Sequence, residues 1–325
     1  MADMSGPKIS IITVVKNDAA GLEKTILSAC GQQGTTPELI VIDGGSTDGT
    51  VAVIRRYQDK IAFWSSESDQ GIYDAMNKGL DKASGEWVIF LNAGDVFSSD
   101  KVLGALTSFL DTAALTTDAI SGKPYSKNQD NPVNTRKMVG SEPVLPTGCG
   151  ENVPGVIYGD SIADYGSFRV YRAAGKPNDL WKGMFCNHQS MLFRREALLT
   201  ISAGRYESGR LKCFSTNLRI SADHDLVCRL YRSGVTFKQV AIPVAIWETG
   251  GLSNKMQVRS VIERYRMIRT WFHRGLKVRV YYLWLLFLAV LVEGMYRLLP
   301  LYLMKPMIRI ANRKSLVSQS KPGSR

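Results

Sequence analysis

Two short segments in the first third of the chain constrain its fold most strongly. Residues 41–50 (VIDGGSTDGT) and residues 90–95 (FLNAGD) are apolar runs that end abruptly in small and acidic residues. Gly, Ser, Asn and Asp are the usual turn residues, so ordinary strand-ending turns are one interpretation. In an open α/β sheet, however, ligands bind beyond the carboxyl ends of the strands. The two segments therefore predict strand ends whose carboxylates could face one nucleotide and its metal.

The apolar pattern around these segments predicts alternating strands and helices. Apolar, β-branched runs indicate strands at residues 9–15, 39–42, 61–64, 87–91, 156–160 and 237–242. Helical periodicity indicates helices at residues 21–33, 47–57, 72–83, 194–202 and 222–232. This order favours βαβ units and a mostly parallel α/β sheet. Residues 116–156 are rich in Gly, Pro, Ser, Thr and Asn, and they predict an irregular insertion over the mouth of the site.

Composition limits the class of protein. A length of 325 residues, 45% of them hydrophobic and 22% charged, suits one large domain or two smaller ones. The five cysteines form no CxxC pair, which argues against a zinc site or a disulfide framework and favours a reducing cytoplasm. The polar residues 1–8 do not resemble a secretory signal.

The positive charge is concentrated at the carboxyl end. Residues 255–325 hold 15 Lys and Arg against two acids, a local charge of +13, although the whole chain carries +12. Residues 281–292 are twelve consecutive apolar residues, and Glu293 and Arg297 then interrupt the run. Because a spanning helix needs about 20 apolar residues, we expect an interfacial helix on acidic lipid. A spanning helix and a helix that packs in the core or in an oligomer are the alternatives.

Two other classes of protein fit less well. A basic tail could bind nucleic acid, but its charges are interleaved with aliphatic runs and it contains no recognised nucleic-acid motif, so we expect no nucleic-acid partner. A dinucleotide-dependent dehydrogenase would carry GxGxxG after its first strand, and this chain does not.

Several motifs resemble the family 2 glycosyltransferases with the GT-A fold. They are residues 10–17 (SIITVVKN), 41–50, 69–79 (DQGIYDAMNKG), 91–95 (LNAGD), 187–190 (NHQS), 222–226 (ADHDL) and 250–253 (GGLS). The resemblance covers roughly residues 8–254 in the family's order, and it is strongest to bacterial enzymes that extend exopolysaccharide, capsule or O-antigen units. It implies a GT-A-type, Rossmann-like nucleotide-binding sheet over residues 1–254, followed by the basic helical region at residues 255–325.

The resemblance assigns a donor site. Thr13 and Asp43 match positions that line the uracil pocket, and Asp74, Lys78 and Asn92 lie in motifs that contact the nucleotide-sugar. A tyrosine that is frequent after the first-strand threonine is replaced by Lys16.

Asp95 matches the metal-binding acid of the DxD-type motif. The usual acid pair before it is absent, because Asn92 and Gly94 stand there. A lone carboxylate suits Mg²⁺ or Mn²⁺ shared with substrate phosphates. A simple turn acid is the alternative for Asp95, as it is for Asp43.

Asp223 matches the family's general base. Ser221 is a plausible N-cap, and an acid in the first turn of a helix is stabilised as its anion. Asp225 is the second choice, and both acids could simply complement the helix dipole. His188 and Gln189 are expected to contact acceptor or diphosphate, with a packing role as the alternative for His188.

The resulting prediction is an inverting, metal-dependent transfer from a nucleotide-sugar, expected to be a UDP-sugar, to a lipid-linked saccharide in surface polysaccharide biosynthesis. The expected place is the cytoplasmic face of the inner membrane, on an acidic membrane surface, and the oligomeric state is left open. The alternatives are a polyisoprenyl-phosphate glycosyltransferase and a non-catalytic protein that binds anionic lipid or nucleic acid.

Overall fold

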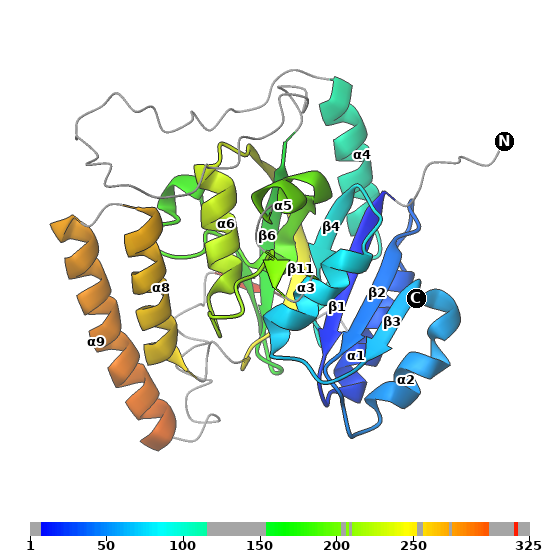
Figure 1. Ribbon diagram of the computed structural model, residues 1–325, viewed down its shortest axis with the longest axis horizontal. Coiled ribbons are helices and arrows are strands. Elements are labelled where there is room, and N and C mark those ends of the chain that lie inside the picture. The colour runs from blue at the N-terminus through cyan, green and yellow to red at the C-terminus, as the bar shows by residue number, and fades with distance from the viewer. Residues whose placement is uncertain are drawn as a thin grey trace.

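The computed structural model describes residues 8–115, 154–202, 206–207, 210–251, 256–272, 275–298 and 315–317 (Figure 1). The predicted insertion at residues 116–156 and the predicted domain boundary after residue 254 lie almost entirely outside this part of the chain. The strands are β1 Ile9–Val15, β2 Glu38–Asp43, β3 Phe63–Ser66, β4 Trp87–Phe90, β5 Val96–Phe97, β6 Val156–Asp164, β7 Arg169–Arg172, β8 Met191–Arg194, β9 Tyr206–Glu207, β10 Arg210–Leu211, β11 Phe237–Glu248 and β12 Leu316–Val317. The α-helices are α1 Ala19–Cys30, α2 Thr50–Arg56, α3 Ile72–Lys82, α4 Val102–Leu115, α5 Arg195–Ser202, α6 Ala222–Arg232, α8 Gln257–Trp271 and α9 Leu276–Leu298, and the 3₁₀ turns are η1 Gln58–Lys60, η2 Pro177–Asp179 and η3 His188–Ser190.

The first four strands form a parallel sheet, as the sequence predicted. β1 is buried along its whole length and lies between β2 and β4, and β3 continues the sheet beyond β2. The chain therefore moves outward through β2 and β3 and then returns to the other side of β1 as β4. Such a reversal of strand order leaves a crevice at the carboxyl ends of the strands, where α/β proteins bind ligands. Both segments that the sequence singled out end here.

The second half of the sheet corrects the expectation of a mostly parallel arrangement. β8 is antiparallel to both β4 and β6, and β7 is antiparallel to β6. β11 runs parallel to β6 and antiparallel to β5. β6 leads directly into β7 without a helical crossover, and strands joined in that way can pair only in antiparallel fashion. The fold is therefore a mixed α/β sheet, consistent with the GT-A architecture.

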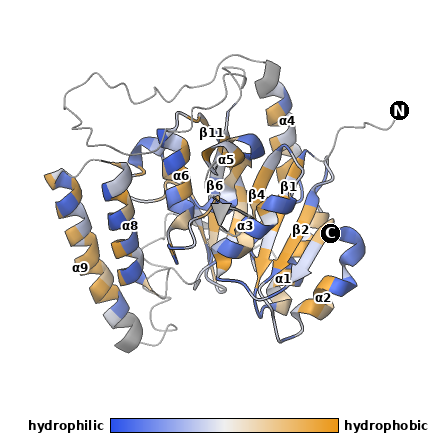
Figure 2. Ribbon diagram, in the orientation of Figure 1, coloured by the Kyte–Doolittle hydropathy of each residue, from blue (hydrophilic) through white to orange (hydrophobic). Residues whose placement is uncertain are grey.

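Helices cover both faces of this sheet and bury two apolar cores. α1, α2 and α4 cover one face, where Leu22 and Leu106 are buried. α3, α5, α6 and α8 cover the other, where Met76 and Leu226 are buried (Figure 1). Figure 2 shows hydrophobic strands between these helical layers. The two layers leave the carboxyl ends of β1, β2 and β4 as a rigid edge on which loops can place polar side chains.

Within the predicted basic region, the described residues form the helices α8 and α9 and the short strand β12, which pairs with β7. α8 packs against α6, and α9 lies on the outer side of α8 (Figure 1). Trp271 of α8 donates its indole N–H to Asp225 of α6 at 2.7 Å. Among the described residues, no helix combines the length and the apolar character needed to cross a membrane.

Candidate functional site

The predicted base pocket lies between the loops that follow β1 and β2. Asp43 ends β2 and is fully buried, and its carboxylate accepts hydrogen bonds from the Ser46 N–H at 3.1 Å and from the hydroxyls of Ser46 and Ser66. Gly45 has a φ of +77°, which a side chain would strain. Asn17 joins the two loops, because its amide oxygen accepts the Thr47 N–H at 2.8 Å. The predicted base-binding residues therefore lie in two loops that are joined by hydrogen bonds, and not in two separate turns.

Thr13 lies on the neighbouring strand and on the same side of the sheet as Asp43. The register pairs Thr13 with Val41 and Val15 with Asp43, so Thr13 and Asp43 alternate onto one face. The Thr13 hydroxyl is buried and has no hydrogen-bond partner among the described residues. Buried hydroxyl groups are normally hydrogen-bonded, and a bound ligand could supply the missing hydrogen-bond partner of Thr13.

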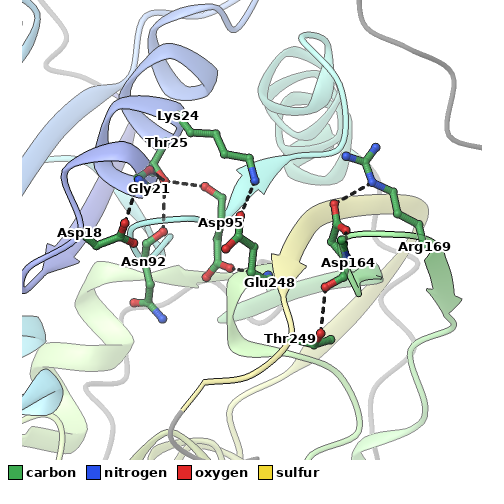
Figure 3. Close-up of polar contacts among 11 residues, drawn as sticks. Asp18, Gly21, Lys24, Thr25, Asn92, Asp95, Asp164, Arg169, Glu248 and Thr249 are labelled. Carbon is green, nitrogen blue, oxygen red and sulfur yellow. Dashed lines mark hydrogen bonds and ion pairs between the residues drawn. The ribbon is translucent and has the colours of Figure 1, made fainter. Parts of the chain in front are cut away.

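Asp95 lies in the loop after β4 and is 5% exposed. Its Oδ2 accepts the side-chain N–H of Gln189 at 2.9 Å. Its Oδ1 accepts the backbone N–H of Glu248 at 3.1 Å (Figure 3). Burial raises the pKa of Asp95 to about 6, and these two hydrogen bonds only partly oppose that rise. A nearby cation would relieve the cost of the buried charge.

Asn92 supplies a second oxygen in the same loop. Its Nδ2 lies 3.4 Å from Nε2 of His188, and its Oδ1 is buried without a hydrogen-bond partner in the described structure. In Figure 3 the side chains of Asn92 and Asp95 extend from the loop toward the same side. The described residues contain no group of three or more His, Cys, Asp or Glu arranged around a metal. The donors fit a hard divalent cation that takes its remaining ligands from substrate phosphates.

Asp223 lies in the first turn of α6, partly buried, and it contacts His188. Its Oδ2 is 3.1 Å from His188 Nδ1, and its Oδ1 accepts the His224 N–H at 2.8 Å and lies 3.3 Å from the Tyr73 hydroxyl oxygen. Burial alone would raise the pKa of Asp223, but the hydrogen bonds from His188 and from the His224 N–H hold this pKa below its ordinary value. Asp223 is therefore ionised near neutral pH, as a general base must be.

The turn η3 connects Asp223 and Asp95. His188 contacts Asp223, and the next residue, Gln189, donates to Asp95. The neutral His188 tautomer that donates from Nδ1 leaves Nε2 to accept from Asn92, which matches both observed contacts. The structure thus brings together Asn92, Asp95, His188, Gln189 and Asp223, five of the residues that the sequence singled out.

Asp225 is placed differently. Its two carboxylate oxygens accept the Arg229 Nε–H at 2.9 Å and the Trp271 Nε1–H at 2.7 Å. Asp225 is 6% exposed and Arg229 is 5% exposed. These contacts tie α6 to α8, and they leave no carboxylate oxygen of Asp225 directed at the group around His188.

Asp74 and Lys78 form a separate charged group on α3. Asp74 contacts Lys212 at 3.4 Å and Lys78 at 3.7 Å, and Lys78 also contacts Glu67 at 2.9 Å. Burial would raise the pKa of Asp74, but the Gln70 N–H and the two lysines lower it overall. Glu67 joins this group to β2, because its backbone N–H donates to the Asp43 carbonyl at 3.0 Å. The role of Asp74 and Lys78 in donor binding stays a prediction.

Sequence reasoning missed Tyr73 and Glu248. Tyr73 lies inside the motif at residues 69–79, and its hydroxyl donates to the Ile220 carbonyl at 2.6 Å, which holds the start of α6. Glu248 immediately precedes residues 249–251 and bonds Asp95 through its backbone. Its carboxylate pairs with Lys24 at 2.6 Å (Figure 3). Glu248 could not have been found from the sequence, because a backbone donor does not depend on the identity of its side chain. Tyr73 could have been considered only because it lies within a motif.

Comparison with known proteins gives an independent result. The sequence profile of Glycosyl transferase family 2 matches residues 10–201. A PGL/p-HBAD biosynthesis glycosyltransferase of Mycobacterium bovis is 27% identical over 270 residues, which are 81% of this chain and 86% of that relative. An uncharacterized glycosyltransferase of Mycobacterium tuberculosis is 41% identical over 120 residues. That match spans 37% of this chain and only 42% of the relative's length.

Solved structures agree on the fold. The mannosyltransferase PcManGT from Pyrobaculum calidifontis, in complex with GDP-Man and Mn²⁺, has a TM-score of 0.53 at 15% identity and covers 94% of this chain and 81% of its own. TarS from S. aureus in complex with UDP-GlcNAc has a TM-score of 0.51 at 13% identity and covers 80% of this chain and 66% of its own. The family profile spans more than half of the chain, so this protein belongs to glycosyl transferase family 2 and is a glycosyltransferase.

Proposed function

We propose that this glycosyltransferase transfers a sugar from a nucleoside-diphosphate donor to a saccharide hydroxyl in one inverting step, with Asp223 as the general base. Asp95 and Asn92 would hold a divalent cation together with the donor diphosphate. Thr13 and Asp43 bind the base of the nucleotide.

The observation that carries the proposal is the position of η3. His188 and Gln189 are consecutive, and they contact Asp223 at 3.1 Å and Asp95 at 2.9 Å. Consecutive residues of one short turn therefore hold an ionised acid and the acid that we propose binds a cation, and this suits a reaction in which one acid activates the acceptor while the other assists the leaving group. His188 orients Asp223, and the His224 N–H holds the other carboxylate oxygen.

The reaction balances with these residues alone. Asp223 accepts the proton of the acceptor hydroxyl as that oxygen forms a bond to the anomeric carbon. The bond from the anomeric carbon to the diphosphate oxygen breaks, and the nucleoside diphosphate leaves with both electrons. A single displacement of this kind inverts the anomeric configuration, and we expect it here because of the family resemblance.

Mg²⁺ or Mn²⁺ would neutralise charge on the departing diphosphate. Asp95 and Asn92 provide oxygen ligands of the type these ions prefer. The elevated pKa of Asp95, about 6 in the metal-free protein, predicts that binding of the cation competes with a proton.

The donor is proposed to be a UDP-sugar, because the pocket around Asp43 matches the uracil-binding positions of the family. TarS is described as a complex with UDP-GlcNAc and PcManGT as a complex with GDP-Man, so both nucleotides belong in the test. The M. bovis relative is named for PGL/p-HBAD biosynthesis. In line with that name, we propose a lipid-linked saccharide as the acceptor and a place in surface polysaccharide or glycolipid synthesis, with polyisoprenyl phosphate as the alternative acceptor.

The test incubates full-length protein with UDP- and GDP-sugars and with saccharide, lipid-linked saccharide and polyisoprenyl phosphate acceptors, and identifies products by mass spectrometry. We expect one donor to give a product whose anomeric configuration is opposite to that of the donor. EDTA should stop turnover, and Mn²⁺ or Mg²⁺ should restore it.

Two matched substitutions separate the roles. Asp223→Asn should retain donor binding and lose activity, whereas Asp59→Asn, an exposed acid in η1, should change neither. Retained configuration in the product, or normal turnover of Asp223→Asn, would refute the assigned mechanism. Turnover that EDTA leaves unchanged would refute the metal assignment.

A further inference from the structure

One face of α9 is apolar and exposed. Seven large hydrophobic residues, here named the α9 stripe, are between 49% and 76% exposed: Leu276, Val280, Leu283, Trp284, Phe287, Val290 and Leu291. At 3.6 residues per turn, their spacing places them within an arc of roughly 120° along the helix. The other large apolar residues that are exposed in the described structure are Leu27, Ile72 and Tyr171, which lie on three separate elements. The α9 stripe is therefore a contiguous apolar patch and not a set of isolated exposed hydrophobic residues.

The opposite face of α9 is fixed to the rest of the protein. Tyr282 and Ala289 are 3% and 4% exposed. The Tyr282 hydroxyl donates to the Trp181 carbonyl at 3.0 Å, and the Tyr281 hydroxyl donates to the Lys182 carbonyl at 3.3 Å. These contacts set the rotation of the helix, so the stripe faces outward on the edge of the molecule where Figure 1 shows α9 outside α8.

Basic residues border the stripe. Lys277 and Arg279 are exposed at the start of α9, and the helical period places one on each side of the apolar arc. Arg266 and Arg269 are exposed on the neighbouring α8. Glu293 is the one acid within residues 276–298, and it accepts the Val258 N–H at 3.2 Å. An apolar face with basic margins matches a helix that lies in the headgroup region of an anionic bilayer.

We propose that the α9 stripe docks on an anionic lipid surface, with α9 lying in the plane of the interface. Charge complementarity favours this occupant over a second copy of the chain, because the exposed Lys277, Arg279, Arg266 and Arg269 would face the same positive charges on that copy. The same charge attracts acidic lipid, where each basic residue near the surface adds to the affinity. The proposal does not depend on the chemistry at Asp223 or Asp95.

The test is flotation of the full-length protein with vesicles of phosphatidylcholine alone and with an equal mixture of phosphatidylcholine and phosphatidylglycerol. We expect strong flotation with the mixture and weak flotation with phosphatidylcholine. Leu283→Glu combined with Phe287→Glu should reduce binding to the mixture by roughly 100-fold or more, because two apolar contacts are lost. Leu27→Glu, which changes a leucine on α1 that is 51% exposed, is the control and should float like the parent.

Two further variants separate the charge from the apolar contact. Lys277→Glu combined with Arg279→Glu should reduce binding to the mixture by at least about 30-fold, with little change on phosphatidylcholine. The blue shift of tryptophan fluorescence on addition of vesicles should disappear in Trp284→Phe, a substitution too mild to unfold the helix.

Three results would overturn the proposal. The first is a parent protein that does not float with anionic vesicles. The second is a Leu283→Glu/Phe287→Glu variant that floats as well as the parent. The third is a parent that is a dimer by light scattering and becomes monomeric in this variant with unchanged flotation, which would make the stripe a subunit interface.

Discussion

The replacement Asp95→Asn should stabilise the metal-free protein above pH 6. Burial raises the pKa of Asp95 from 3.8 to about 6, so the unfolded chain loses this proton at a lower pH than the folded chain does. The free energy of unfolding therefore falls as pH rises from about 4 to about 6. At about 1.4 kcal/mol per pKa unit, the ionised side chain costs the fold about 3 kcal/mol. Asn removes that cost, and it can still accept the Glu248 N–H while the Gln189 amide turns its oxygen toward it.

Urea unfolding of the parent and of Asp95→Asn over a pH series, in EDTA, measures this directly. The two proteins should be equally stable below about pH 4, and the variant should be more stable by up to about 3 kcal/mol above about pH 6. Mn²⁺ added above pH 6 should stabilise the parent and not the variant. A difference that does not change with pH, or a variant less stable than the parent at neutral pH, would refute the reasoning about burial.

Three other predictions rest on α6. Asp223→Asn should lower kcat by about 10²–10⁴-fold with donor affinity retained, as steady-state kinetics and calorimetric titration will show. Asp225→Ala should instead lower the free energy of unfolding by about 3–5 kcal/mol, because Arg229 would remain buried without its partner, and chemical denaturation tests this. Burial lowers the pKa of His224 to about 4, so the free energy of unfolding of the parent should fall by about 3 kcal/mol relative to His224→Gln as pH falls from about 6.5 to about 4. Gln keeps a donor for the Leu180 carbonyl. A stability difference that does not change with pH would count against a neutral buried His224.

The sequence predicted the parallel half of the fold well, because β1, β2 and β4 are short, buried, β-branched runs. It did not predict α4, whose residues lie just before the region without periodicity. It also did not predict β7 and β8, which have four residues each. Strands this short carry too few residues for a periodic signal. Their pairing depends on contacts between distant segments, and that information is not local.

The sequence could name candidate acids but could not orient them. Residues two apart on a helix point in different directions, so at most one of Asp223 and Asp225 can face the site. The sequence alone does not say which of the two it is. The structure places Asp223 beside His188 and directs Asp225 toward Arg229. In the same way, residues 281–292 are apolar at every position. Packing against α8 and the contacts with residues 181–182 separate the buried face of α9 from the exposed one.

The adjacency of His188 and Gln189 has a consequence for engineering. The groups that hold the two acids are one peptide unit apart, and neighbouring Cα atoms are separated by about 3.8 Å. A chimera that exchanges α6 to alter acceptor preference, or the loop after β4 to alter the donor, must therefore keep or exchange η3 together with it. A graft with a junction inside residues 187–190 will displace the contacts to both Asp223 and Asp95. A graft that moves residues 187–190 as one unit preserves the spacing between the two contacts.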